Sequence, residues 1–163
     1  MTDGSEAFTK LVSQLDYSMF IVTVAADGER AGCLIGFASQ VSIDPGRFLA
    51  CLSVKNRTYR VAQSARVLAV HFLAEDQVEL AELFGSETGD EIDKFERCEW
   101  RPGPDGAPIL SEAPNWFAGR VLERLDFGDH CGFLLEPVEG EASRSSSTLT
   151  FRRAKWIDPG HAP

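Results

Sequence analysis

The alternation of apolar and polar residues along the chain predicts mostly β-strands. The clearest run, Phe20–Ala26, is rich in β-branched residues and leads directly into Asp27-Gly28, a dipeptide typical of a two-residue hairpin turn. We expect the returning strand to run from about residue 30 to residue 43 as one element. In all, the pattern predicts strands at residues 20–26, 30–43, 48–52, 66–73, 115–127, 131–138, 148–151 and 154–157.

Three short helices are predicted as well. Residues 6–15 carry apolar side chains at helical spacing, and we expect this stripe to face the core. Its members are Phe8, Leu11, Val12 and Leu15. A second helix is expected from Asn56 to about Ser64, and a third from Gln77 to Phe84, ended by Gly85.

The order of these elements predicts a mainly β fold with helices. Six or more strands joined by hairpins and helices, without regular alternation of strand and helix, favour an antiparallel barrel. We assign residues 1–163 to a single domain, because this length is enough for one core. The chain has neither the glycine-rich motif of dinucleotide-binding folds nor that of P-loops.

Composition limits the class of protein. A net charge of −9 argues against a nucleic-acid-binding surface. The four cysteines are widely spaced without a Cys-x-x-Cys pair, so neither a metal site nor a dithiol centre is predicted. No apolar stretch approaches the ~20 residues needed to cross a bilayer, and the first residues do not resemble a secretory signal. We therefore expect a cytoplasmic protein with free thiols that does not act at a membrane.

The uneven distribution of charge points to a candidate anion site. None of the 25 Asp and Glu residues lies between residues 45 and 74. That stretch holds the basic residues Arg47, Lys55, Arg57, Arg60 and Arg66. Residues 75–99 hold ten carboxylates against two basic residues, and we interpret this stretch as a solvated outer face. A basic stretch inside an acidic protein suits a small anion better than a polymer.

Residues 53–60, the basic segment, lie where an apolar run ends and a helix begins. Asn56 is a good N-cap, which puts Arg57 in the first helical turn. Unpaired N–H groups and the helix dipole favour a phosphate or carboxylate there. Cations normally avoid a helix N-terminus. A bound anion would explain why Lys55, Arg57 and Arg60 gather at this one. The alternative is a solvated helix start that happens to be basic.

The expected strand at residues 30–43 carries unusually small side chains. It includes Gly32 and Gly36, where a plain strand would carry bulk. Glycine in a strand indicates a bulge or the close approach of another group. A flat ring system lying against the strand would explain the pattern, and so would a kink at a barrel corner. Composition favours neither.

Several short motifs occur in order between about Leu15 and Val138. They are Ile21-Val22-Thr23 with Asp27-Gly28, residues 36–45, Asn56-Arg57-Thr58-Tyr59, Ala81-Glu82-Leu83-Phe84-Gly85, Asp93-Lys94-Phe95, Gly106-Ala107-Pro108-Ile109-Leu110 and Gly128-Asp129-His130. As an ordered set they resemble the flavin reductase-like family, whose domain is an FMN-binding split β-barrel. The chain departs from that family at Cys33, Gly36 and Ala38, where many members carry hydroxyl or amide side chains.

The resemblance implies a cofactor and a set of site residues. FMN, or FAD in some members, would lie at a homodimer interface, with NADH or NADPH as the hydride donor. The flavin ring would rest against residues 36–42 and the phosphate against the basic segment. The implied cofactor-binding residues are Gly36, Phe37, Ala38, Ser39, Gln40, Ser42, Ser53, Lys55, Asn56, Arg57, Thr58 and Phe84. His130 is the candidate catalytic residue, and a turn histidine without a role in the reaction is the alternative.

The function implied by the resemblance is an NAD(P)H-dependent flavin reductase, with a separate oxygenase as a candidate partner. One alternative is an FMN-binding carrier or electron-transfer protein without reductase turnover. Another is a split-barrel enzyme that uses a deazaflavin.

Overall fold

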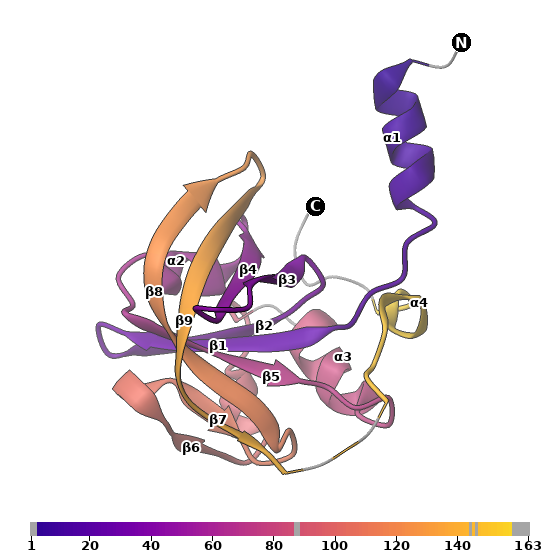
Figure 1. Cartoon of the computed structure of the whole chain (residues 1–163). Coiled ribbons are helices and arrows are strands. Elements are labelled where there is room, and N and C mark those ends of the chain that lie inside the picture. Colours follow the sequence, from indigo (N-terminus) through magenta and orange to yellow (C-terminus); the bar gives the residue numbers. More distant parts are fainter. Residues whose placement is uncertain (1–2, 87–88, 144, 146, 158–163) are drawn as a thin grey trace.

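A curled antiparallel sheet forms the body of the protein (Figure 1). The computed structural model describes residues 3–86, 89–143, 145 and 147–157. Seven strands pair in the order β2-β1-β5-β8-β9-β4-β3, and two short strands, β6 and β7, pair separately. The strands are β1 Phe20–Ala26, β2 Glu29–Ile35, β3 Ala38–Ser42, β4 Arg47–Ser53, β5 Val67–Phe72, β6 Trp100–Pro102, β7 Pro108–Leu110, β8 Asn115–Asp126 and β9 His130–Ala142. The predicted mainly β, antiparallel architecture is confirmed.

The first hairpin forms as its sequence predicts. Asp27 and Gly28 have φ values of 53° and 77°, and two positive φ values in succession are the signature of a type I′ turn. β1 pairs with both β2 and β5, and its side chains Ile21, Val22 and Val24 are fully buried. The β-branched run therefore forms the inner part of the barrel wall.

The prediction of one strand over residues 30–43 is wrong. The chain leaves β2 at Ile35 and begins β3 at the opposite edge of the sheet, beside β4. Two intervening residues allow a span of at most ~10 Å, so the two edges lie close together and the sheet must curl. A Cβ atom at Gly36 would lie 2.4 Å from the ring of Tyr17. The barrel-corner explanation therefore holds for this glycine, and Tyr17 fills the space that it leaves.

β4 is buried on one face only, although its sequence is largely apolar. Phe48, Ala50 and Leu52 point into the core, whereas Leu49 and Cys51 between them are partly exposed. The alternation places apolar side chains on the outside of the barrel.

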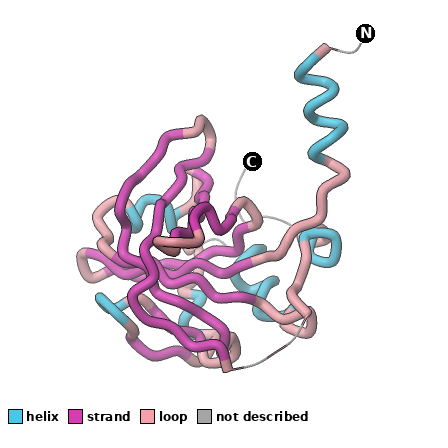
Figure 2. Tube along the Cα trace, viewed as in Figure 1, coloured by secondary structure: helices cyan, strands magenta, loops and turns pink. Residues whose placement is uncertain are grey.

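In the described residues, four α-helices and two 3-10 turns connect or flank the strands. They are α1 Gly4–Val12, α2 Arg57–Ala62, α3 Val78–Ser86, α4 Phe151–Ala154, η1 Lys94–Glu96 and η2 Pro104–Gly106. The expectation that the first helix packs on the core is wrong, because α1 has no buried residue and projects away from the barrel (Figure 2). No helix in the described parts of the chain is long and apolar enough to cross a bilayer.

The closing strands predicted at residues 148–151 and 154–157 are also wrong. Isolated bridges join Thr148 to Ala74 and Thr150 to Ser18, and the chain then forms α4. The ring of Phe151 stacks on Tyr17 with centroids 4.9 Å apart. This end of the chain therefore docks mainly on the segment that precedes β1.

Candidate functional site

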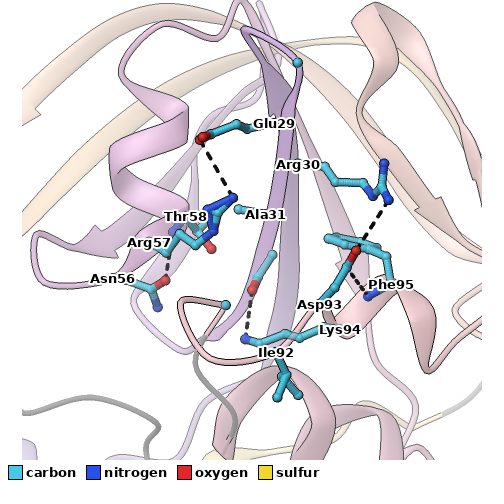
Figure 3. Close-up of a pocket in the computed structure, with 13 residues that line it drawn as sticks. Glu29, Arg30, Ala31, Asn56, Arg57, Thr58, Ile92, Asp93, Lys94 and Phe95 are labelled. Carbon is cyan, nitrogen blue, oxygen red and sulfur yellow. Dashed lines mark hydrogen bonds and ion pairs between the residues drawn. The ribbon is translucent and has the colours of Figure 1, made fainter.

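A pocket of about 260 Å³ opens beside the start of α2 (Figure 3). Its walls come from residues 28–32 on the first hairpin, residues 56–58 at the start of α2, and the segment that leads into η1. We call it the α2 pocket. Of the predicted site residues, it brings together Asn56, Arg57 and Thr58.

The start of α2 agrees only in part with the predicted anion site. Asn56 Oδ1 accepts a hydrogen bond from the Thr58 N–H at 2.9 Å, so the predicted N-cap is confirmed. That amide is therefore already satisfied, and the Thr58 hydroxyl is buried beside the Cys33 thiol. α2 has only six residues. Side-chain charge, more than the helix terminus, must attract an anion here.

Arg57 is one of three basic side chains that line the α2 pocket, with Arg30 and Lys94. Its Nη2 lies 3.7 Å from Glu29 Oε2, and the Glu29 side chain is 62% exposed. On the opposite wall, Arg30 Nη2 lies 3.4 Å from Asp93 Oδ2 (Figure 3). Because the Arg57 pair is long and water-screened, it contributes little, and a phosphate can replace Glu29 as the partner of Arg57.

Arg60 does not share this role. Its Nη2 lies 2.6 Å from both carboxylate oxygens of Asp90, and this contact lowers the pKa of Asp90. Arg66 pairs in the same way with Asp105, at 3.1 Å. Asp90 is exposed, as the predicted solvated face requires, and in addition it neutralises part of the basic segment.

Lys94 is a part of the pocket that sequence reasoning missed. Its side chain is nearly buried, and Nζ donates hydrogen bonds to the backbone carbonyls of Gly32 and Phe84, each at 3.0 Å. These bonds fasten β2 to α3 behind the pocket. The Asp93-Lys94-Phe95 motif was a signal for this segment, but its distant carbonyl partners leave no trace in the sequence.

A second group of predicted residues meets where β4 pairs with β9. Ser53 is the cross-strand partner of His130, and the Phe37 ring lies 4.9 Å from the imidazole. His130 Nδ1 lies 2.8 Å from Asp129 Oδ1, and this hydrogen bond lowers the pKa of Asp129. We call Phe37, Ser53, Asp129 and His130 the His130 cluster. With Nδ1 directed at Asp129, Nε2 is the ring nitrogen on the far side of the imidazole.

One tight turn joins the His130 cluster to the α2 pocket. The Asn56 N–H donates to the Ser53 carbonyl at 3.0 Å, and the Val54 N–H donates to the Asp129 carbonyl at 3.0 Å. Lys55 lies in this turn, and its charge adds a smaller effect that also lowers the pKa of Asp129. The two groups of residues are therefore joined through the backbone of this turn.

The predicted residues on β3 lie outside both groups. Ser39 Oγ donates to the Gln40 carbonyl and Gln40 Nε2 donates to the Ser42 carbonyl, so these side chains bind the strand's own backbone. Ala38 pairs with Ala50 at the start of the strand. β3 thus flanks the His130 cluster without lining the α2 pocket.

Two further predictions need correction. The Phe84 side chain is 1% exposed and packs on Phe95 in the core, so it lies behind the pocket, where a ligand cannot touch it. Gly36 is covered by Tyr17 and Met19, so its missing side chain does not leave an open surface for a ring. Both residues lie near the site for reasons of packing.

Comparison with known proteins gives one consistent family. Residues 12–156 match the family model described as flavin reductase like domain. A probable flavin reductase of Rhizobium meliloti (strain 1021) is 34% identical over 85% of this chain, and this chain spans 44% of that protein. FMN reductase (NADH) RutF of Acinetobacter baylyi is 25% identical over 98% of this chain and 84% of its own length. The reductase component of a 4-nitrophenol 4-monooxygenase/4-nitrocatechol 2-monooxygenase of Rhodococcus opacus is 30% identical over 91% of this chain and 78% of its own.

Solved structures extend the likeness to the fold. A flavin reductase domain protein from Arthrobacter sp. FB24 superposes with a TM-score of 0.80 at 25% identity, over 90% of this chain and 89% of that one. The matched residues include the α2 pocket and the His130 cluster. This chain belongs to the flavin reductase-like family.

Proposed function

We propose that this protein is an NAD(P)H-dependent flavin reductase that transfers hydride to FMN or FAD. The observation that carries the proposal is the turn at residues 53–56, which joins the Arg57 side of the α2 pocket to the His130 cluster. A cationic pocket next to an aromatic surface with a histidine suits a ligand that carries a phosphate on a planar ring. Membership of the family and the names of the relatives support the same activity.

The α2 pocket suits the phosphate end of a flavin better than the whole molecule. Its volume of about 260 Å³ is below the ~300–1,000 Å³ typical of small-molecule sites. We place the phosphate beside Arg57, with Asn56 and Lys55 at the turn. The ring then lies outside the pocket, over Phe37 and His130, with Ala38 and β3 at its margin.

A bound flavin supplies the hydride-accepting chemistry, and the protein supplies orientation and electrostatics. Arg57 balances the charge of the phosphate. Asp129 accepts the Nδ1–H of His130, which fixes the tautomer and presents Nε2 outward. That nitrogen can accept a proton or, once protonated, donate a hydrogen bond to the reacting edge. The Phe37 ring lies beside the imidazole, with the centroids 4.9 Å apart and the planes tilted by 50°.

An apolar outer face adjoins the proposed ring site. We define it by Phe37, Leu49, Phe127 and Leu134, which lie on the outside of the barrel. Leu49 pairs with Leu134 across β4 and β9, and the ring of Phe127 lies over Gly132 beside Leu49. Phe37 and Phe127 are each more than half exposed. We propose that a second copy covers this face, so that the flavin ring lies at the interface of a homodimer.

Two further parts of the proposal concern the setting of the reaction. A separate oxygenase that uses reduced flavin is the proposed partner, supported by the relative from Rhodococcus opacus. The cytoplasm is the proposed location, because the four cysteines are free thiols, as expected in a reducing compartment.

Steady-state oxidation of NADH and NADPH with added FMN or FAD tests the function. We expect turnover with at least one pair of nucleotides. A purified protein that binds FMN tightly but oxidises neither nicotinamide would refute the reductase and favour an FMN carrier. Competition between FMN and a deazaflavin separates the third alternative.

A further inference from the structure

Helix α1 carries an apolar stripe that no other described part of its own chain covers. Phe8, Leu11 and Val12 are 65%, 64% and 39% exposed, Leu15 just beyond the helix is 57% exposed, and no residue of α1 is buried. The helix stands clear of the barrel and is joined to it by residues 13–17 (Figure 2). A nine-residue helix is marginal in water when isolated, so α1 needs a surface to pack on.

The segment that follows α1 is anchored and directs the helix outward. Arg152 Nη2 donates to the Gln14 carbonyl at 2.9 Å, and the Arg152 N–H donates to Asp16 Oδ1 at 3.0 Å. Tyr17, immediately beyond, stacks on Phe151. These contacts hold residues 14–17 against the end of the chain, and α1 extends outward from that segment (Figure 2).

We propose that α1 docks on a second copy of this chain. The exchange is mutual, because the helix of each subunit covers apolar surface of the other subunit. The base of the helix adjoins the outer face, because the ring of Tyr17 lies 6.3 Å from that of Phe37. In a two-fold symmetric dimer, the α1 stripe and the outer face of each subunit are both covered by the partner.

The size of a stable interface supports this arrangement. A specific interface buries roughly 800 Å² on each partner, and an aromatic side chain as exposed as Phe8 or Phe37 contributes on the order of 100 Å². The four residues of the outer face supply only part of that area. The stripe on α1, with Phe8, Leu11 and Val12, and Leu15 just beyond it add further apolar side chains.

The charge of α1 argues against other occupants. Its Glu6 and Lys10 pair with each other at 2.6 Å, and Asp3 precedes the helix. Helices that lie on membranes carry many Lys and Arg residues on the polar face, and nucleic-acid-binding helices are also basic. A nearly neutral polar face with an apolar stripe suits a protein surface that is itself apolar.

Sedimentation velocity of the full-length chain over a dilution series tests the proposal. We expect the double variant Phe8→Ser/Leu11→Ser to raise the dimer dissociation constant by about tenfold or more, because two buried side chains lose their apolar contacts. Glu6→Gln is the matched control on the polar side of α1, and its dissociation constant should stay within about twofold of the parent. An unchanged constant in the double variant, or a parent that stays monomeric, would overturn the docking.

A photo-crosslinking residue at position 8 gives an independent readout. When isotopically labelled and unlabelled chains are mixed, we expect cross-links that join one label to the other. Cross-links confined to one chain, or flotation of a monomeric parent with vesicles of anionic lipid, would contradict the proposal. The inference shares the proposed homodimer but not the flavin chemistry. If the double variant remains dimeric and still oxidises NADH, the docking of α1 is refuted and the reductase function is not. If the dimer depends on the stripe but the parent oxidises no NADH, the reductase function is refuted and the docking is not.

Discussion

The ring of Phe37 lies 4.9 Å from the imidazole of His130, with the two planes tilted by 50°. Phe37 belongs to the two-residue crossover between β2 and β3, and His130 is the first residue of β9. The presentation of the imidazole therefore depends on how the barrel closes. A variant that disturbs this closure can change both flavin affinity and the rate of flavin reduction. Both quantities must therefore be measured in any variant of the site.

Arg57→Ala is expected to weaken FMN binding about 10- to 100-fold. A charge-assisted contact with phosphate contributes about 1.5–3 kcal/mol, and much of it is lost in the variant. Fluorescence titration at low and high salt measures the effect, which should shrink as salt rises. Arg66→Ala is the matched control, because the Arg66 side chain is 84% exposed and pairs with Asp105 outside the α2 pocket. Equal affinity in Arg57→Ala and the parent would remove Arg57 from the site.

His130→Ala is expected to slow flavin reduction far more than it weakens flavin binding. Loss of a positioned proton donor or acceptor lowers a rate on the order of 10²-fold or more. Stopped-flow reduction by NADH, at saturating FMN, separates the rate from the affinity. Asp129→Asn should cause a smaller loss, because the amide oxygen can still accept the Nδ1–H. Unchanged reduction kinetics in His130→Ala would leave the histidine as a turn residue.

A buried histidine makes the fold sensitive to acid. His71 Nε2 accepts the N–H of Leu110 at 3.0 Å, and Nδ1 donates to the carbonyl of Ile21 at 3.1 Å. Burial lowers the pKa of His71 to about 4, and the hydrogen bond to Ile21 opposes this shift only in part. A proton on Nε2 would break the bond to Leu110, so the folded protein keeps the ring neutral.

The free energy of unfolding should therefore fall as the pH drops from about 6.5 to about 4. In this window the unfolded chain binds a proton at His71 and the folded chain does not. This difference lowers the free energy of unfolding by about 3 kcal/mol across the window. Urea unfolding at several pH values measures the slope. His71→Gln should lose this component of the pH dependence, whereas His130→Gln should keep it. The same slope in His71→Gln and the parent would contradict the assignment.

Gly36→Ala tests why the crossover carries a glycine. The added Cβ would meet the ring of Tyr17, so we expect a loss of about 1–3 kcal/mol in the free energy of unfolding. In a Tyr17→Ala background the same change should cost much less, because the ring is gone. Gly46→Ala is the control, since its nearest atom would lie 3.9 Å away. A change in FMN affinity without a change in stability would instead favour direct contact with a ring.

Local signals in the sequence were reliable where a few neighbouring residues decide the structure. Asp27 and Gly28 form the predicted turn, and Asn56 caps α2 as predicted. The antiparallel class also followed, because β-branched runs and hairpin turns specify it locally.

Contacts between distant residues account for the errors. No local pattern shows that Tyr17 fills the space at Gly36, or that Asp90 neutralises Arg60 from thirty residues away. The exposed stripe of α1 was predicted as core because helical periodicity says that a face is buried but not against which molecule. For the same reason Phe84, predicted from a motif, proved to be a core residue.

The buried ammonium of Lys94 has a consequence for the electrostatic potential of the α2 pocket. It lies behind the pocket wall, and its field reaches the Cys33 thiol, where it partly offsets the rise in pKa that burial causes. Charges withdrawn from solvent are screened by salt much less than exposed ones. The contribution of Lys94 to the potential of the pocket is therefore less sensitive to added salt than the attraction of Arg57.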